Sequence, residues 1–331
     1  MSTIPESMQA VVCEEFAPVA SLQLKTVPTP TAKAHEVLVK ISSTGVNFPD
    51  GLVVQGLYQV KPPLPFIPGS EVSGEIVAVG DKVTHLNVGQ QVIAWCMLGG
   101  FAEYVSIPAT HVLPLPAPTD MDAIAGLITA HATAHHGLKQ RAEVKPEDVV
   151  LVTGAAGGTG SAAVQIAKVM GATVIAACSS AEKCEFAKSQ GADHTIDLSQ
   201  TELKAPVMSL TEGRGVDVVY ECVGGALFDQ CVRTMAFGGR LLVVGFASGE
   251  IPQFSVNLAL VKGFSVVGVF WGTFTQHQPE VFRDNMAELI QWYMQQRVHV
   301  HVDNTFSLSE TVDALEYVAG RKVLGKVIVK A

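Results

Sequence analysis

The chain has 331 residues, of which 48% are hydrophobic and only 16% are charged. This length suits two domains of ordinary size, and the composition excludes a disordered protein because it supplies enough apolar surface for substantial cores. The chain carries 22 basic and 31 acidic residues, and the resulting net charge of −9 argues against a broad nucleic-acid-binding surface.

The apolar runs are too short for a membrane-spanning helix. The richest run, Leu258 to Trp271, is interrupted by Lys262, Gly263 and Gly268, whereas a spanning helix needs about 18 or more uninterrupted apolar residues. The opening segment MSTIPES has no basic patch followed by an apolar core, so we expect no secretory signal. These features predict a cytoplasmic protein without membrane contact.

The six cysteines contain no C-x-x-C pair. This spacing argues against a clustered zinc site and against a disulfide framework. We therefore expect reduced and mostly buried thiols at Cys13, Cys96, Cys178, Cys184, Cys222 and Cys231.

Up to about residue 118 the sequence consists of short β runs separated by Gly and Pro, at residues 8–16, 35–46, 74–81, 89–96 and 102–110. Short strands at close spacing are typical of a β-barrel or sandwich. A Pro-rich connector, LPLPAP, then leads to Thr119, which has an acid three residues later. This pattern predicts a helix start before residues 123–138.

From Asp148 onward, apolar β runs alternate with helical segments, and a sixth such strand is expected at residues 264–270. Alternation of this kind is the mark of a parallel sheet covered by helices on both faces. A helix near 280–296, a strand near 298–302, a helix near 309–320 and a final strand at 326–330 follow. We predict an α/β fold with a Rossmann domain over residues 123–271 and a discontinuous β-rich domain formed by residues 1–122 and 272–331.

The sequence Gly154-Ala-Ala-Gly157-Gly-Thr-Gly160 directly follows a predicted strand and precedes a predicted helix. Glycines at this turn let the backbone approach a pyrophosphate, and the helix N-terminus offers free N–H groups to the anion. A bland Gly-rich turn is the alternative, but the strand-turn-helix context favours a dinucleotide. The residues expected to take the pyrophosphate are Ala156, Gly157, Gly158, Thr159 and Gly160.

The end of the second Rossmann strand indicates which dinucleotide is bound. NAD-preferring domains place an acid there against the ribose diol, but this strand ends in Cys178-Ser179-Ser180. Ser179, Ser180 and Lys183 offer hydroxyls and a positive charge to a 2′-phosphate, so NADPH is favoured over NADH. Glu182 is an acid near this position and would favour NADH, but the helix macrodipole alone explains an acid in a first helical turn.

Several motifs together resemble the medium-chain dehydrogenase/reductase superfamily, and within it the zinc-free NADPH:quinone oxidoreductases that include the ζ-crystallin-like proteins. They are GSEVSG at residues 69–74, GVNFPD at 45–50, VVYECVGG at 218–225, GGRLLVVGFASG at 238–249 and RKVLGKVIV at 321–329. The resemblance covers essentially the full length. It implies that the β-rich domain is a GroES-like catalytic domain.

In the zinc alcohol dehydrogenases of this superfamily a His occupies the place of Ser70 and a Cys that of Asn47. Both ligands and the structural zinc lobe are absent here, so we expect no metal. Oxidising a simple alcohol needs a Lewis acid, whereas a quinone or conjugated carbonyl needs only orientation and modest polarisation. The resemblance and this loss predict zinc-independent hydride transfer from NADPH to an activated acceptor.

Four histidines resemble metal ligands in their spacing but are expected to be structural. His131 and His135 are four residues apart on a predicted helix, and no third ligand accompanies them. His299 and His301 alternate on a predicted strand, which an ordinary solvent-facing side explains.

By resemblance, the catalytic residues are Asn47, Asp50 and Tyr58, with Asn47 also near the cofactor. The family often has a Tyr two residues after the Asp, where this sequence has Leu52, so a fixed proton donor is not assigned. Asp50 as a loop-structuring carboxylate and Tyr58 as a loop-packing residue remain open alternatives.

The remaining cofactor-binding candidates are Thr129, which by resemblance matches a residue near the nicotinamide ribose, and residues at the ends of predicted strands. The strand-end residues are Val223, Gly245, Phe246, Ala247, Ser248, Phe270 and Trp271, the last two bordering the nicotinamide and the acceptor. Arg321 and Lys326 lie in the closing segment, from which a basic side chain could reach a phosphate, but we expect both to be solvated.

Two other functions stay open. One is an enoyl- or acryloyl-thioester reductase or an alkenal reductase with the same cofactor chemistry. The other is an NADPH-binding structural or RNA-binding protein of the ζ-crystallin-like type, against which the acidic charge argues. The apolar sixth strand at residues 264–270 would otherwise be an exposed sheet edge, so we predict a homodimer joined there.

Overall fold

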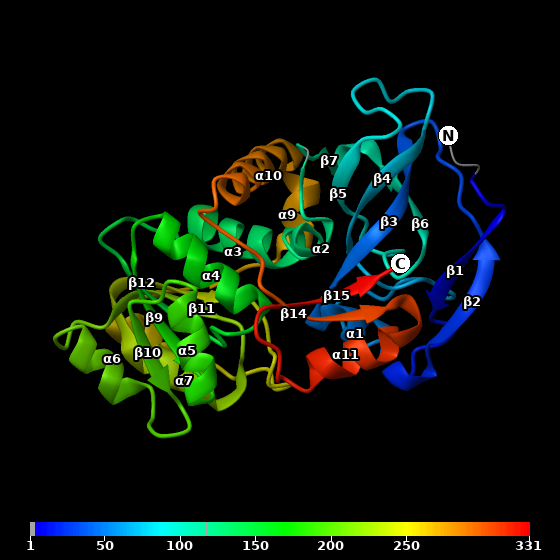
Figure 1. Ribbon diagram of the computed structural model, residues 1–331. Helices are drawn as coiled ribbons and strands as arrows, with labels where there is room; N and C mark the ends of the chain where they lie inside the picture. Colours follow the sequence, from blue (N-terminus) through cyan, green and yellow to red (C-terminus); the bar gives the residue numbers. More distant parts are fainter. Residues whose placement is uncertain (1–3, 117) are drawn as a thin grey trace. The chain divides into compact units, whose positions relative to one another are not determined.

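The computed structural model describes residues 4–116 and 118–331. Residues 1–3 of the opening segment and residue 117 of the Pro-rich connector lie outside it. The chain divides into two compact units, shown in Figure 1. Unit 1 contains the described residues up to Thr129 together with Val300–Ala331, and unit 2 contains Ala130–His299. Residues 272–299, which the sequence analysis assigns to the discontinuous domain, belong to unit 2 in this division.

Unit 1 is built on a mostly antiparallel sheet with the strand order β14-β15-β3-β4-β5-β7, in which β6 also pairs with β3. A separate antiparallel pair is formed by β1 and β2. The strands are β1 Ser7–Val12, β2 Gln23–Pro28, β3 Glu36–Val46, β4 Glu71–Val79, β5 Gln91–Trp95, β6 Tyr104–Pro108, β7 Val112–Pro114, β14 Val302–Ser307 and β15 Lys326–Lys330. All five predicted N-terminal β runs are confirmed as strands. The run expected near 298–302 is wrong in its bounds, because β14 begins only at Val302.

The helices of unit 1 are short, because the sheet supplies most of its core. They are α1 Phe48–Val54, α2 Met121–Ala125 and α11 Thr311–Ala319, with single turns at Val19–Ser21, Ala109–His111 and Leu308–Glu310. Helix α2 begins near the predicted place, but Asp120 rather than Thr119 caps it. The Asp120 carboxylate accepts the backbone N–H groups of Asp122 and Ala123, which satisfies donors that the first helical turn leaves free.

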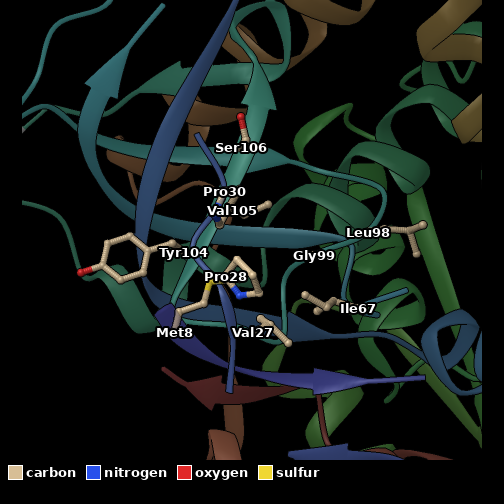
Figure 2. Close-up of a pocket in the computed structure, with 10 residues that line it drawn as sticks. All are labelled: Met8, Val27, Pro28, Pro30, Ile67, Leu98, Gly99, Tyr104, Val105 and Ser106. Atoms are coloured by element: carbon tan, nitrogen blue, oxygen red, sulfur yellow. The ribbon is translucent and has the colours of Figure 1, made fainter. Parts of the chain in front are cut away.

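The cavity drawn in Figure 2 lies in unit 1 and has a volume of about 390 Å³. Its walls come from β1, β2, β6 and three loops, and they include Met8, Val27, Ile67, Leu98 and Tyr104. These side chains are mostly apolar, and none belongs to the predicted catalytic or cofactor-binding set. We therefore do not assign the chemistry to this cavity.

Unit 2 contains a parallel six-stranded sheet with the order β10-β9-β8-β11-β12-β13, as the doubly wound prediction requires. The strands are β8 Val149–Thr153, β9 Thr173–Cys178, β10 His194–Asp197, β11 Val216–Glu221, β12 Met235–Val243 and β13 Ser265–Gly268. Its helices are α3 Thr133–His136, α4 Gly158–Val169, α5 Ala181–Ser189, α6 Lys204–Leu210, α7 Gly225–Thr234, α8 Asn257–Lys262, α9 Trp271–His277 and α10 Pro279–Met294. Strand order reverses between β8 and β11, and ligands bind at such a switch point, outside the carboxyl ends of the strands.

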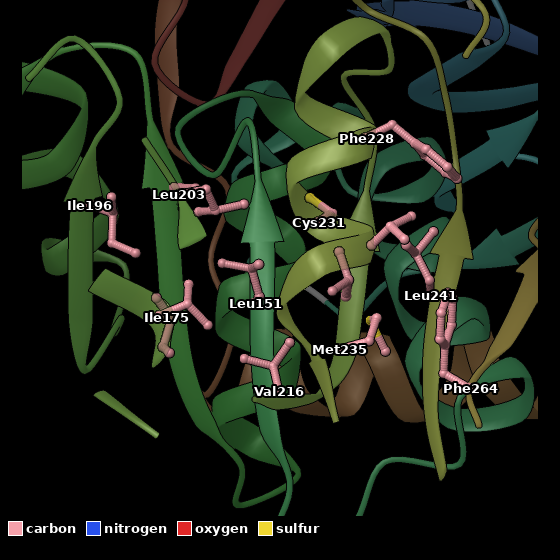
Figure 3. Packing of buried hydrophobic residues seen from close by; sticks show 14 residues of the cluster. Leu151, Ile175, Ile196, Leu203, Val216, Phe228, Cys231, Met235, Leu241 and Phe264 are labelled. Atoms are coloured by element: carbon pink, nitrogen blue, oxygen red, sulfur yellow. The ribbon is translucent and has the colours of Figure 1, made fainter. Parts of the chain in front are cut away.

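One face of this sheet is sealed by side chains from the strands and from helix α7. Figure 3 shows Leu151, Ile175 and Ile196 on neighbouring strands, with Phe228 and Cys231 projecting from α7. Every one of these side chains is buried. Burial of this kind is worth roughly 25 cal/mol per Å² of apolar surface removed from water, so this cluster stabilises unit 2.

The predicted helix over residues 123–138 is interrupted. Between α2 and α3 the chain forms a wider, π-helical turn at Ile128–Ala132, and a second such turn follows at Gly137–Arg141.

No helix among the described residues is long and apolar enough to cross a membrane. All six cysteines are free thiols, and all but Cys96 are buried, as predicted.

His131 and His135 are both buried within unit 2. The His135 Nε2 atom lies 2.7 Å from Glu288 Oε2 on α10. Burial nevertheless lowers the pKa of His135 to about 4, despite the opposing effect of Glu288. The described part of the chain contains no group of three or more His, Cys, Asp or Glu side chains placed to hold a metal ion.

We predict that His135 makes the protein sensitive to mild acid. In the unfolded chain the imidazole titrates at its ordinary pKa near 6.5, so between pH 6.5 and pH 4 the unfolded state binds a proton that the folded state does not. Stability is therefore lost as the pH falls through this range, by roughly 3 kcal/mol at most. Urea denaturation at pH 7 and pH 4.5 should show a smaller loss for His135→Gln, which keeps an N–H for Glu288. His194→Gln, at an exposed position, is the control, and equal losses in all three proteins would contradict the assignment.

Candidate functional site

Three neighbouring strands of unit 1 bring together residues that are far apart in the sequence. Strand β15 pairs with β3 so that Val327 lies opposite Val46, and β3 pairs with β4 so that Gly45 lies opposite Glu71. This register places the first residue of β15, Lys326, beside Asn47, and Glu71 on the other side of β3. The result is a row of polar side chains in a sheet whose other buried positions are mostly apolar.

Lys326 is almost completely buried, with only 4% of its surface exposed, and its prediction as a solvated residue is wrong. Its ammonium donates to Glu71 Oε1 at 2.8 Å, to Asn47 Oδ1 at 2.7 Å and to the carbonyl oxygen of Val46 at 3.0 Å. An ammonium has three N–H donors, so these contacts use all of them. Glu71 is fully buried, and this ion pair neutralises it.

Asn47 is held rigidly by the same network. Its side-chain NH₂ donates to Glu71 Oε1 at 2.7 Å and to the Gly45 carbonyl at 3.3 Å. A Cβ at Gly45 would lie only 2.5 Å from Glu71 Oε1, so glycine is required where the carboxylate crosses β3. Asn47 also begins helix α1 rather than lying in an open loop.

Asp50 lies in the first turn of α1 and is 5% exposed. Its Oδ2 atom accepts the backbone N–H of Asn47 at 2.8 Å, and the Ser70 side chain lies near enough to lower its pKa. Burial raises the pKa of the Asp50 carboxyl to about 7, against the lowering effect of the Asn47 N–H and of Lys326. Tyr58 is half-buried. Its pKa is raised, first by burial and second by the charge of the nearby Asp50. The three predicted catalytic residues therefore lie in one region of unit 1.

Thr129 joins this region from the other side of Glu71. Its backbone N–H donates to Glu71 Oε2 at 2.7 Å. Its hydroxyl oxygen is buried and has no hydrogen-bond partner among the described residues. A buried hydroxyl left without a partner costs free energy unless a ligand or water satisfies it, which fits the predicted role of Thr129 in holding the cofactor.

In unit 2 the glycine loop lies between β8 and α4, at the switch point of the sheet. Gly154 has a positive φ of 58°, and a Cβ at Gly160 would lie 2.1 Å from the Gly154 carbonyl oxygen. Only glycines permit this tight turn and this close approach of the helix to the loop. Helix α4 begins at Gly158, so the N–H groups of its first turn are available to an anion.

Two further loops close the same edge of the sheet. The N–H groups of Ala247 and Ser248 donate to the carbonyls of Cys222 and Val223 at 3.0 and 2.7 Å. The predicted residues Val223 and Gly245–Ser248 are therefore brought together.

Glu221, which the sequence analysis did not single out, anchors this edge. It is fully buried, and its Oε1 accepts the N–H groups of Val223 and Gly224 at 2.8 and 2.9 Å. Thr153, at the end of β8, donates its hydroxyl to the same oxygen at 3.2 Å. A carboxylate at the end of a β run was the available signal in the sequence.

The candidate 2′-phosphate residues lie together at the end of β9. Ser180 caps helix α5 by accepting the Lys183 N–H, and the Lys183 ammonium donates to the Ser179 hydroxyl at 3.2 Å. Two hydroxyls, a cation and a helix N-terminus thus converge.

The two predicted aromatic residues differ in their surroundings. Trp271 is buried against Phe282, whereas Phe270 is 46% exposed.

Comparisons with known proteins agree with this architecture. The family model named Alcohol dehydrogenase GroES-like domain matches residues 33–117, and the model named Zinc-binding dehydrogenase matches residues 158–292. The chain is 38% identical to Quinone oxidoreductase-like protein 2 homolog of Nematostella vectensis, over 98% of this chain and 89% of the relative. It is 35% identical to Prostaglandin reductase-3 of Bos taurus, over 99% of this chain and 91% of the relative.

Solved structures give the same result. The mycobacterial protein Rv1454c complexed with NADPH is 31% identical, with a TM-score of 0.92 and coverage of 98% of this chain and 100% of that one. A quinone oxidoreductase of Pseudomonas syringae is 28% identical with the same TM-score and coverage. The fold and site therefore define an oxidoreductase of the medium-chain dehydrogenase/reductase superfamily. Within it, the chain belongs to the quinone oxidoreductase family, which confirms the resemblance seen in the sequence.

The name of one matching family model refers to zinc, but the residues present here do not fit a zinc ion. Asn47 and Ser70 stand where the zinc alcohol dehydrogenases have Cys and His, and they offer neither a thiolate nor an imidazole. The Lys326 ammonium lies 2.7 Å from Asn47 Oδ1, and a second cation beside it would be repelled. We derive no chemical step through a metal at this site.

We predict that Lys326 and Glu71 are strongly coupled in stability. Lys326→Met leaves the Glu71 charge buried and unpaired, which should lower the free energy of unfolding by about 3–5 kcal/mol. A Lys326→Met/Glu71→Met double variant should lose much less than the sum of its single variants. The control is Lys330→Met on the same strand, because its pair with Asp122 is exposed and such pairs contribute about 1 kcal/mol or less. Urea denaturation of the four variants measures these differences, and additive losses would refute the coupling.

Proposed function

We propose that this protein is a zinc-independent reductase that transfers a hydride from NADPH to a quinone or another conjugated carbonyl. The observation that carries the proposal is the glycine loop at the switch point, where Gly160 approaches the Gly154 carbonyl as only a glycine can. Membership of the quinone oxidoreductase family supports the same reading. When bound, NADPH supplies the hydride.

Each part of the cofactor has residues suited to it. Backbone N–H groups of the glycine loop and of the first turn of α4 hold the pyrophosphate, except that of Gly157, which donates to the Gly154 carbonyl at 3.0 Å. Ser179, Ser180 and Lys183 hold the 2′-phosphate. The unsatisfied Thr129 hydroxyl takes a ribose hydroxyl. In a chain with a net charge of −9, these local groups must replace the general attraction that a basic protein would offer.

The residues on the acceptor side act by orienting the acceptor, and they do not need to change its charge. Asn47 is fixed by Lys326 and Glu71, Tyr58 orients the carbonyl oxygen, and Phe270 supplies an apolar wall. A quinone or enone is already electrophilic, so positioning against the nicotinamide accounts for most of the catalysis.

The thioester or alkenal reductase remains the alternative within enzymology. Relatives named for quinone oxidoreduction and for prostaglandin reduction support keeping more than one acceptor class open. The RNA-binding alternative has no specific support, because the net charge is −9 and nucleic-acid binding needs a basic patch. A cytoplasmic location stays a prediction, supported by six free cysteines.

We also propose a homodimer joined through β13. This strand ends the sheet of unit 2 and pairs, within the described chain, with β12. Exposed apolar side chains lie on it and on the neighbouring helix α8, namely Val266, Leu260 and Val261. An apolar edge strand of this kind invites pairing with a second copy.

The function is tested by a cofactor titration followed by an acceptor panel. NADPH should bind more tightly than NADH, and Ser179→Asp should reverse the preference by repelling the 2′-phosphate and binding the ribose diol. Lys188→Ala, an exposed change on helix α5, which follows Ser179, is the control. NADPH oxidation is then measured with a quinone, an enal and an enoyl thioester, and tight NADPH binding without turnover of any acceptor would sink the enzyme proposal.

The dimer is tested by sedimentation in dilute solution. We expect about twice the 35.0 kDa mass of the chain, and a monomer for Val266→Lys, because a charge on the strand opposes edge pairing. Val88→Lys, which changes an exposed valine of unit 1, should stay dimeric. A monomeric wild type would overturn the proposal.

A further inference from the structure

Every hydride that the proposed reductase delivers must be followed by a proton, and the structure points to its source. We propose that Asp50 stores this proton as a neutral carboxylic acid and that the Ser70 hydroxyl passes it to the reduced acceptor. This inference rests on the proposed function and adds to it the proton donor.

Among the residues that the structure describes, no cation pairs directly with Asp50. The three donors of the Lys326 ammonium are spent on Glu71, Asn47 and the Val46 carbonyl. Asp50, at 5% exposure, receives one backbone N–H, from Asn47. An ionised carboxylate buried in this way is costly, so a neutral acid suits the site better.

The titratable groups around Asp50 are either paired with each other or have a raised pKa. Lys326 and Glu71 form a buried ion pair with each other, and the other titratable neighbours are Tyr58 and Cys96. Burial and the charge of Asp50 raise the pKa of both of these groups, so neither competes as an anion near neutral pH. With its own pKa raised to about 7, Asp50 both holds and releases a proton under ordinary conditions.

Ser70 provides a route outward from Asp50. Its side chain lies near enough to the Asp50 carboxyl to lower the pKa of that group, and the residue is only half-buried. The Ser70 carbonyl accepts the backbone N–H of Cys96 at 2.9 Å, which fixes its position just before β4. A hydroxyl donates and accepts at once, so it can give one proton and take another.

The proton reaches the reduced acceptor through two linked transfers. Hydride transfer adds two electrons and one hydrogen to the acceptor and leaves an anion on it. The Ser70 O–H bond breaks as its proton forms a new bond to that anion, and the Asp50 O–H bond breaks as its proton restores the Ser70 hydroxyl. Asp50 is left as a carboxylate and takes a proton from water before the next turnover.

The test compares four variants in the full-length protein. Asp50→Asn and Ser70→Ala should lower kcat by about 10²-fold, while the NADPH dissociation constant changes less than about threefold. Ser70→Thr keeps the hydroxyl and should restore most of kcat. The matched control is Ser73→Ala on β4, which removes a hydroxyl that donates to the Met121 carbonyl. This variant should behave like the wild type.

The pH profile separates proton donation from a structural role. Because Asp50 must be protonated to act, wild-type kcat should fall as the pH rises through about 7, and the remaining activity of Asp50→Asn should not follow this fall. A solvent deuterium isotope effect on kcat should be present in the wild type and altered in Ser70→Ala. An infrared carboxylic-acid band that titrates near pH 7 and is absent in Asp50→Asn would confirm the stored proton without any turnover.

Three results would overturn the inference. In the first, Asp50→Asn keeps the wild-type kcat and pH profile, which would mean that water supplies the proton. In the second, it loses folding or NADPH binding but keeps the pH profile in its residual activity, which would mean a structural role. In the third, the wild type binds NADPH but reduces no acceptor, which overturns the proposed function itself and is seen before any variant is compared.

Discussion

The buried ion pair between Lys326 and Glu71 is the constraint around which unit 1 is organised. A lysine and a glutamate with almost no exposure are tolerated only if every donor and acceptor finds a partner. Three strands supply these partners, because β15 carries Lys326, β4 carries Glu71 and β3 lies between them. The closing residues of the chain are thereby fastened to the segment that begins α1, and Asn47 has a single orientation.

This pair also separates two carboxylates that the sequence alone treats alike. Glu71 is paired with the lysine, while Asp50 accepts one backbone N–H and has only a serine side chain nearby. Glu71 is therefore suited to stay charged, and Asp50 is suited to bind and release a proton. Environments that divide two neighbouring acids in this way are a common basis for acid–base chemistry in enzymes.

Unit 2 solves a different problem, which is to bind an anionic cofactor in an acidic protein. The glycine loop and the start of α4 offer backbone N–H groups, which carry no net charge and need no basic patch. Glu221 supports this edge from below by holding the N–H groups of Val223 and Gly224. The carboxyl ends of β8 and β11 are thus joined at the point where the strand order reverses.

The sequence by itself determined the class of fold and the nucleotide loop, because strand periodicity and the spacing of Gly154, Gly157 and Gly160 are local properties. The acidic balance and the absence of zinc ligands at Asn47 and Ser70 were equally plain. Smaller features depended on competing local signals, such as the choice of Asp120 over Thr119 as a helix cap.

Only the tertiary structure decided what Lys326 does. A lysine near the end of a chain is solvated in most proteins, and nothing local in RKVLGKVIV marks one as buried. Its partners, Asn47 and Glu71, are 279 and 255 residues away, and strand register alone brings them within hydrogen-bond distance. The same register leaves Asp50 without a cation, because hydrogen-bond partners are assigned by geometry across strands and not by order along the chain.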